Sequence, residues 1–83
     1  VTADLVHIDA AHEYDDVMQD IRLWWPLIEP GGLLMGDDYT IWWPGVVRAV
    51  NEFAAENNLQ VYVDADVKWF YHKKHTEYKH KGK

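Results

Sequence analysis

The sequence predicts an α/β domain in the order β-α-β-α-β-β, with a mostly parallel sheet and one antiparallel strand. Short apolar runs alternate with two longer segments that have helical periodicity. Helices between successive apolar strands favour parallel pairing through right-handed crossovers. The last two strands are joined by so short a turn that only an antiparallel hairpin can connect them.

The first half of the chain predicts a strand, an amphipathic helix and a second strand. Residues 5–8 form an apolar run that predicts a buried strand. Apolar residues then recur at three-to-four spacing over residues 14–28, with acidic residues opposite them. Pro26 predicts that this helix kinks or ends near Trp25. Residues 29–32, Glu-Pro-Gly-Gly, predict a turn, and residues 33–35 predict a second buried strand.

The second half predicts a helix and a β-hairpin. Pro44 suits the first turn of a helix, and apolar residues recur helically over residues 46–54. Asn57 and Asn58 give a stop signal. Residues 59–63 alternate apolar and polar, residues 64–66 predict a tight turn, and residues 67–72 alternate again as a final strand.

The composition indicates one small folded domain. The chain has 83 residues, of which 48% are hydrophobic, and it contains five Trp. It has no Cys, which excludes disulfides and thiolate metal sites and predicts a reducing, cytoplasmic compartment. No apolar run approaches the ~20 residues that cross a bilayer, so no membrane partner is expected.

Charge divides the chain into an acidic body and a basic tail. Residues 1–66 hold 13 of the 14 acidic residues and two arginines, a net charge of −11, whereas residues 67–83 carry six lysines and a net charge of +5. An acidic body does not suit nucleic acid, since phosphate neutralisation needs clustered cations. We therefore expect a partial α/β domain over residues 1–72 and a flexible basic tail over residues 73–83.

Polar residues follow both predicted parallel strands at the point where each strand ends. Asp9 and His12 follow the first strand, and Asp37 and Asp38 follow the second. Ligands of open α/β sheets bind outside the carboxyl ends of the strands. Three carboxylates at one edge predict a site for Mg²⁺ or a similar divalent cation. A histidine at its rim predicts a general base, with His12 taking a proton from a substrate hydroxyl.

Each of these residues also has a structural explanation. Asp9 suits a helix N-cap, and Asp38 suits an Asx turn. His12 alone also fits a surface position. Trp42 and Trp43 fit either packing at the start of the following helix or a lid that faces the substrate.

At these residues the chain resembles the class I S-adenosylmethionine-dependent methyltransferases, in particular the catechol-type and sugar O-methyltransferases. The resemblance covers roughly residues 3–72 and is specific as a combined pattern. The matching residues are Ile8-Asp9-x-x-His12-x-Tyr14, Asp20, Leu27-x-x-Pro30-Gly31-Gly32, Asp37-Asp38-Tyr39, Gly45-Val46, Ala49-Val50 and Phe53.

The resemblance implies the C-terminal half of a Rossmann-like methyltransferase fold. That fold has seven strands, with an antiparallel last strand inserted beside the fifth, and this chain would supply strands four to seven. The first half of such a fold carries the glycine-rich loop and the acidic residue that hold S-adenosylmethionine. Neither matches here, so we expect the donor to bind to the parent protein and not to this chain alone.

The resemblance also implies roles for the site residues. Metal-dependent members use an Asp that matches Asp9 and a pair that matches Asp37 and Asp38; an alternative alignment pairs Asp38 with Tyr39. His12 stands where catechol-type members have a base lysine. Sugar-type members have an acidic base at the position of Ala11, so that role is lost here.

Two functions remain open on the sequence. One is a fragment of an O-methyltransferase for a small molecule or sugar, inactive alone because the donor-binding half is missing. The other is a non-catalytic, homo-oligomeric α/β module with a divalent-metal site. If the piece folds alone, the unpaired edge of the first strand predicts a homo-oligomer or a swapped assembly, because such an edge invites another chain.

Overall fold

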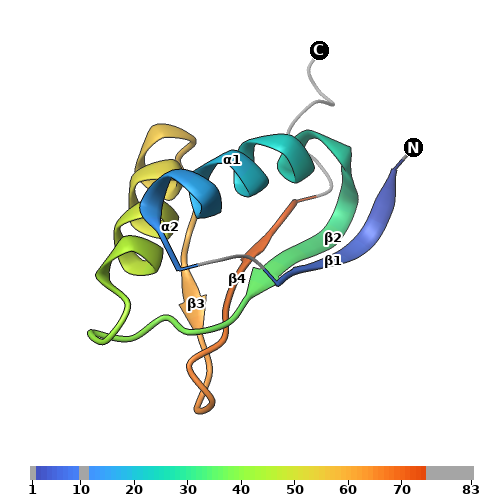
Figure 1. Ribbon diagram of the computed structural model, residues 1–83. Helices are drawn as coiled ribbons and strands as arrows, with labels where there is room; N and C mark the ends of the chain where they lie inside the picture. The colour runs from blue at the N-terminus through green and yellow to red at the C-terminus, as the bar shows by residue number, and fades with distance from the viewer. Residues whose placement is uncertain (1, 10–11, 75–83) are drawn as a thin grey trace.

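The computed structural model describes residues 2–9 and 12–74, with four strands and two α-helices in the order β-α-β-α-β-β (Figure 1). The elements are β1 (Ala3–Ile8), α1 (Tyr14–Trp24), the 3-10 helix η1 (Trp25–Leu27), β2 (Ile28–Gly36), α2 (Pro44–Glu56), β3 (Tyr62–Val63) and β4 (Trp69–His72). The predicted element order and the α/β class are confirmed.

The sheet has the strand order β1-β2-β4-β3. β1 pairs with β2 in parallel, whereas β2 and β3 each pair with β4 in antiparallel fashion. The prediction of a mostly parallel sheet is therefore wrong, since two of the three pairings are antiparallel. The physical reason is the position of β4. It is the one reversed strand, and it lies between β2 and β3. Its pairings with both of these strands are therefore antiparallel.

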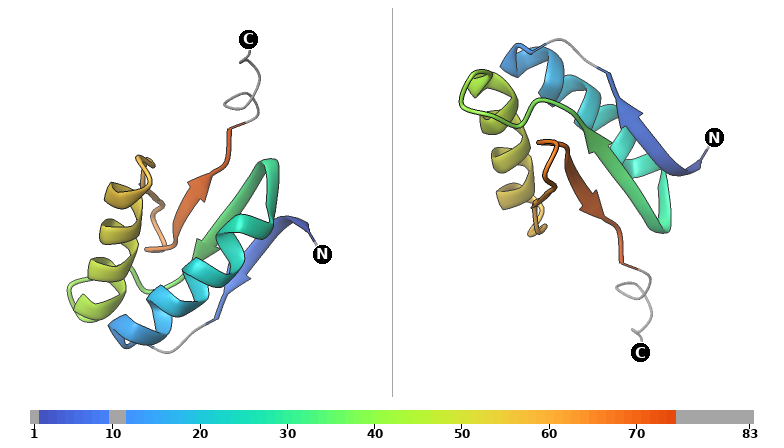
Figure 2. Two further views of the ribbon diagram at one scale, coloured as in Figure 1. Left: turned by 90° about the horizontal axis from the view of Figure 1, so that it is seen from above. Right: turned by 90° about the horizontal axis from the view of Figure 1, so that it is seen from below.

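One face of the sheet packs against both helices. Figure 2 shows α1 and α2 lying on the same side of the strands. Alternate strand residues point to that side, so Ile8, Leu34, Trp69 and Tyr71 are buried. The core also contains Val17, Met18 and Ile21 of α1 and Val46, Ala49, Val50, Phe53 and Ala54 of α2. Burial of these apolar stripes holds both helices against this face of the sheet.

The helix boundaries follow the proline signals. α1 ends at Trp24, and Pro26 lies in η1, where a missing N–H is tolerated. Pro44 is the first residue of α2, and Asn57 is its C-cap. The predicted end of the first helix and both ends of the second are thus confirmed to within one or two residues.

Two segments differ from their predictions. Residues 29–32 are not a turn but part of β2, where they form an irregularity opposite Asp4. Gly32 suits this place because a Cβ there would lie 2.5 Å from the Asp4 carbonyl oxygen. The predicted strand over residues 59–63 shortens to Tyr62–Val63, since Leu59 and Val61 pack on the core without joining the ladder.

The predicted tail begins against the sheet. The Lys73 backbone pairs with Gly31 and Gly32, and its Nζ donates to the Trp25 carbonyl at 2.8 Å. The remaining predicted tail, residues 75–83, lies outside the described residues. Within the described ranges, no helix has the length and apolar character required to cross a membrane.

Tyr71 links the sheet to α2 and should make stability fall at high pH. Its hydroxyl donates to the Val50 carbonyl at 2.6 Å, and burial raises the pKa of Tyr71 well above its usual value. Above pH ~10 the unfolded chain ionises this phenol while the folded chain keeps it protonated. The free energy of unfolding should therefore fall by up to about 1.4 kcal/mol per pH unit from this group.

Urea titrations of Tyr71→Phe between pH 7 and pH 11 test this effect. The variant should lose about 0.5–1.5 kcal/mol at pH 7 through the missing hydrogen bond. The difference in the free energy of unfolding between the wild type and the variant should shrink as the pH rises past 10. Tyr62→Phe, at an exposed position, is the control. If this difference stayed constant between pH 7 and pH 11, burial would not be raising the pKa of Tyr71.

Candidate active site at the carboxyl edge of the parallel strands

The ends of β1 and β2 lie side by side. Ile8 pairs with Gly36, so Asp9 and Asp37 leave the sheet at neighbouring positions. This confirms that the two polar strand ends share one edge. They surround a pocket of about 190 Å³. Its lining residues are Ile8, Asp9, His12, Val17, Asp37, Asp38, Val46 and Trp69.

A larger pocket, of about 1000 Å³, lies at the opposite end of the sheet. It lies where β2 begins at Ile28 and where β4 ends at His72. Substrate sites of α/β sheets lie at the carboxyl ends of the parallel strands. The smaller pocket has that position and is therefore the candidate substrate site.

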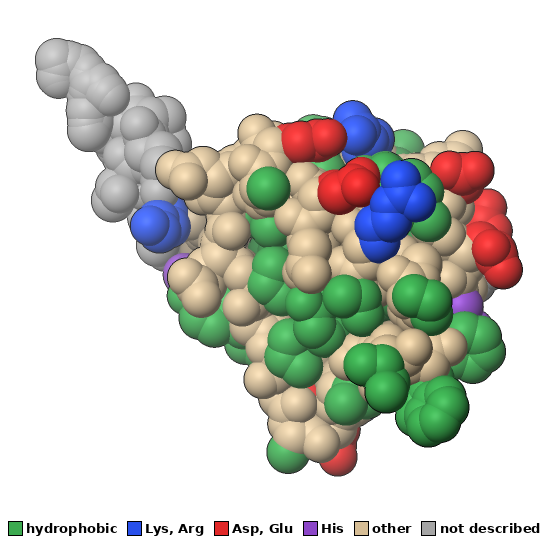
Figure 3. Space-filling model, turned by 90° about the vertical axis from the view of Figure 1, so that its left-hand side faces the viewer, with side chains coloured by type: hydrophobic (Ala, Val, Ile, Leu, Met, Phe, Trp, Pro, Cys, Tyr) green, Lys and Arg blue, Asp and Glu red, His purple; other side chains and the backbone are tan. Residues whose placement is uncertain are grey.

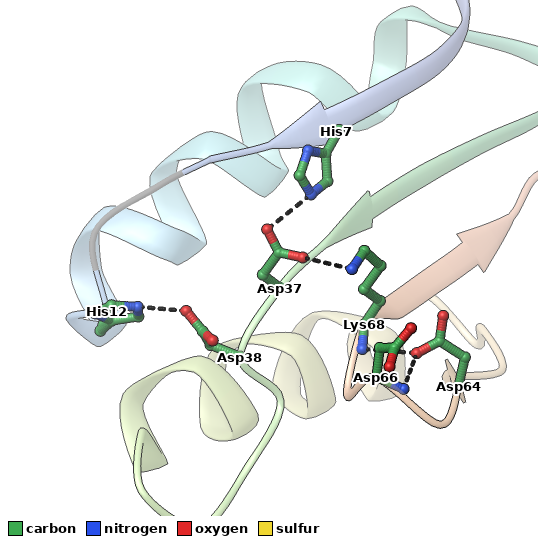
Figure 4. Close-up of polar contacts among 7 residues, drawn as sticks. All are labelled: His7, His12, Asp37, Asp38, Asp64, Asp66 and Lys68. Atoms are coloured by element: carbon green, nitrogen blue, oxygen red, sulfur yellow. Dashed lines mark hydrogen bonds and ion pairs between the residues drawn. The ribbon is translucent and has the colours of Figure 1, made fainter.

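Asp37 and Asp38 are adjacent in sequence but have different partners (Figure 4). Asp38 has a φ of 65°, in the left-handed region that Asp tolerates better than most residues. Asp37 contacts His7 on β1, whereas Asp38 contacts His12 in the segment before α1. The two carboxylates therefore have separate basic partners, although both line the same pocket.

His12 and Asp38 form the shortest of the histidine–carboxylate contacts. Nε2 of His12 donates to Oδ2 of Asp38 at 2.6 Å, and both side chains are about 40% exposed, at 36% and 43%. This bond places the proton on Nε2 and leaves Nδ1 as the acceptor nitrogen. A carboxylate that holds one nitrogen of an imidazole also stabilises the imidazolium that forms when the other takes a proton. The pair has the arrangement of a general base.

Asp37 is held by two basic side chains. His7 Nε2 lies 3.0 Å from Asp37 Oδ2, and Lys68 Nζ lies 3.5 Å from Oδ1. Lys68 follows the β3–β4 turn, in which the Asp64 carboxylate accepts from the backbone N–H groups of Asp66 and Lys68. Figure 4 shows Lys68 reaching from this turn toward Asp37.

The same turn also binds the loop after β2 directly. Tyr39 N donates to the Val67 carbonyl at 3.0 Å, and Val67 has a φ of 55°. A β-branched residue in the left-handed region is strained, by roughly 1–3 kcal/mol. This strain is located where the turn holds the chain segment that carries Asp38.

Helix α2 anchors the segment that carries His12. The Tyr14 hydroxyl donates to Glu52, which also accepts from Arg48 Nε at 3.0 Å. The hydrogen bond from Tyr14, and then that from Arg48, lower the pKa of Glu52. Because Tyr14 begins α1, two residues after His12, this network ties the start of α1 to α2.

The residues do not assemble the predicted metal site. Residues 2–9 and 12–74 contain no group of three or more His, Cys, Asp or Glu side chains that could hold a metal ion. Asp37 and Asp38 instead have basic partners from the protein itself. Magnesium is therefore unsupported, and the metal roles of Asp9, Asp37 and Asp38 stay a prediction. The capping alternative for Asp9 is not observed, since Glu13 is the N-cap of α1.

Sequence reasoning did not find the partners of three residues near this site: His7 and Lys68, which contact Asp37, and Trp43, which was expected to pack at the helix start or to form a lid. His7 has the signal of strand alternation, because it points to the face opposite that of the buried Ile8. The contacts of Lys68 and Trp43 had no local sequence signal, because the partner of each residue is distant in sequence. Trp43 stacks on His12, with ring centroids 3.7 Å apart.

Gly45 is the contact point between α2 and the His12 segment, and Gly45→Ala should destabilise the protein. A Cβ at this position would lie 2.7 Å from the His12 carbonyl oxygen and 2.8 Å from Tyr14 N. Helix propensity alone favours Ala over Gly by about 1 kcal/mol. We expect the clash with the backbone to outweigh the gain in helix propensity. Gly45→Ala should therefore lower the free energy of unfolding, measured with urea, by about 1–3 kcal/mol. Ala55→Gly, at an exposed position of α2, is the propensity control; a more stable Gly45→Ala would refute the contact.

Known proteins share parts of this sequence and fold. Residues 1–39 match a family described as a methyltransferase domain. The uncharacterized protein R132 of Acanthamoeba polyphaga mimivirus is 36% identical over 55 residues, which are 64% of this chain and 25% of that protein. The structure of the O-methyltransferase NovP matches with a TM-score of 0.75 at 20% identity, over 88% of this chain and 30% of that one. The chain thus spans less than a third of the length of either protein.

Proposed function

We propose that this chain, whose fold resembles part of an O-methyltransferase structure, is the acceptor-activating part of a class I S-adenosylmethionine-dependent O-methyltransferase. The acceptor is a small molecule or a sugar with a hydroxyl group. The observation that carries this proposal is the 2.6 Å contact between His12 and Asp38 beside a pocket at the carboxyl edge of β1 and β2.

The residues of this chain would activate the acceptor. Nδ1 of His12 accepts the proton of the acceptor hydroxyl, and Asp38 stabilises the imidazolium that results. S-adenosylmethionine, when bound, supplies an electrophilic methyl group to the activated oxygen. Lys68 neutralises Asp37, which limits like-charge repulsion around Asp38.

The donor site lies outside these 83 residues. Gly31 and Gly32, the one Gly-Gly pair of the sequence, belong to β2 and not to a loop between a strand and a helix. The residues here therefore do not fit the donor, and we expect the 83-residue chain to be inactive alone. A cytoplasmic location belongs to the same proposal and depends on the cysteine-free composition.

Donor binding tests the proposal. The full-length product of the reading frame that contains these residues is titrated with S-adenosylmethionine in a calorimeter, beside the 83-residue chain. We expect binding to the longer protein and none to the chain. Methyl transfer to a panel of phenols and sugars, followed by mass spectrometry, then identifies the acceptor. A longer protein that binds no donor would rule the function out.

The second candidate, a homo-oligomeric module, depends on the edge of the sheet. β1 is at one end of the strand order, and Leu5 on β1 is 58% exposed. We propose that the free side of β1 pairs with a second copy when the chain is on its own. Sedimentation of the 83-residue chain over a range of concentrations tests this. A monomer at the highest concentration would exclude such pairing.

A further inference from the structure

Trp43 lies against the histidine of the site. Its indole ring is stacked on the His12 imidazole, with a centroid distance of 3.7 Å and an angle of 16° between the planes. Trp43 is 41% exposed and is not part of the core, so core packing does not explain its place. The side of the molecule that carries α2 shows a gathering of hydrophobic side chains (Figure 3). Ile41, Trp42 and Trp43 are the exposed apolar residues of the loop before α2.

The start of α2 holds Trp43. It is the N-cap residue, its N–H donates to the Thr40 carbonyl at 3.0 Å, and its carbonyl accepts from Val46 N at 3.0 Å. Pro44 follows and disfavours the helical backbone conformation at the residue before it. The backbone of Trp43 is therefore bonded on both sides and restricted by Pro44, which makes the indole a well-placed surface for a neighbouring ring.

The two contacts of His12 restrain different motions. The hydrogen bond to Asp38 holds one nitrogen but still allows the imidazole to rotate about that bond. The stack on Trp43 holds the plane of the ring. Together the two contacts fix the orientation of the imidazole ring, and with it the direction in which Nδ1 points.

We propose that Trp43 is a positioning residue that acts on the acceptor through His12. This inference rests on the proposed function, in which His12 is the base. Loss of the stack should impair the proton transfer and leave binding of the acceptor nearly unchanged. A displacement of about 1 Å in a reacting group can cost on the order of 10²-fold in rate. Trp43→Leu should therefore lower kcat by up to about 10²-fold with little change in KM. Trp43→Phe, which keeps a ring for stacking, should recover most of that loss.

A measurement without catalysis separates the stack from the function. In NMR spectra of the 83-residue chain at one fixed pH, the ring current of the indole should move the His12 ring protons upfield. Trp43→Leu should return them downfield, and Trp43→Phe should retain part of the shift. Trp42→Leu removes a neighbouring Trp that is 79% exposed and should leave these resonances in place.

Each outcome tests a different part of the proposal: the stack, the positioning role or the assignment of His12 as the base. Resonances that do not respond to Trp43→Leu would overturn the stack, whatever the activity of the longer protein. Resonances that move while kcat of the longer protein stays at the wild-type value would overturn the positioning role. If His12→Gln itself keeps full activity, the base assignment fails, and the positioning role of Trp43 fails with it. A moved resonance with a kcat loss that Trp43→Phe restores supports the proposal.

Discussion

Replacing His12 by Gln should lower the kcat of methyl transfer by the full-length protein by about 10²–10⁴-fold, the usual contribution of a general base. Gln keeps a polar side chain that can reach Asp38, but it cannot accept a proton from the acceptor hydroxyl at neutral pH. The expected change is in kcat, because the pocket walls formed by Ile8, Val46 and Trp69 are unaltered. Single-turnover measurements with saturating acceptor determine it.

His7 provides the matched control for this substitution. It also pairs with a carboxylate, at 3.0 Å, and its side chain is 43% exposed, compared with 36% for His12. It differs in that it does not line the 190 Å³ pocket. His7→Gln should therefore leave kcat within a few-fold of the wild type. Equal losses in the two variants would point to a general effect of surface charge and against a specific base.

Replacing Trp69 by Ala should destabilise the fold by about 3–5 kcal/mol, the usual cost of truncating a large buried aromatic. Trp69 is 1% exposed and is among the largest fully buried side chains. Its indole lies against Gly36 of β2, so closely that a Cβ on Gly36 would come within 2.7 Å of the ring. The truncation would leave a cavity between β2, β4 and the helices. Because small domains have only about 5–15 kcal/mol of stability, this loss would be a large part of it.

Urea unfolding followed by far-UV circular dichroism measures this loss. Trp42→Ala is the control, since Trp42 is 79% exposed and its truncation should change stability by no more than about 0.5 kcal/mol. Similar losses in the two variants would show that Trp69 is not the centre of the core. Gly36→Ala should also destabilise, because the added methyl group would push the Trp69 ring away.

Parts of the site were predictable because they depend on local pattern and strand direction. Parallel strands bring their carboxyl ends to one edge, so the proximity of Asp9 and Asp37 followed from two apolar runs separated by a helix. The divergence of Asp37 and Asp38 did not follow. It depends on the left-handed backbone of Asp38 and on partners that are 26 or more residues distant from each carboxylate. The metal prediction assumed carboxylates without basic neighbours, and the folded chain supplies those neighbours.

The sequence by itself determined the α/β class, the order of the elements and the ends of both helices, because periodicity, proline and short turns act over a few residues. The residue pattern alone left the place of β4 open; the resemblance implied a reversed last strand beside the fifth, and tertiary structure places β4 beside β2. A reversed strand could have been added at the sheet edge, but its apolar residues Trp69 and Tyr71 are buried between β2 and the helices, and this makes the sheet mostly antiparallel in its pairings. It also decided the partners of Asp37, Asp38 and His12, since contacts between distant residues form only when the packed core brings their backbones together.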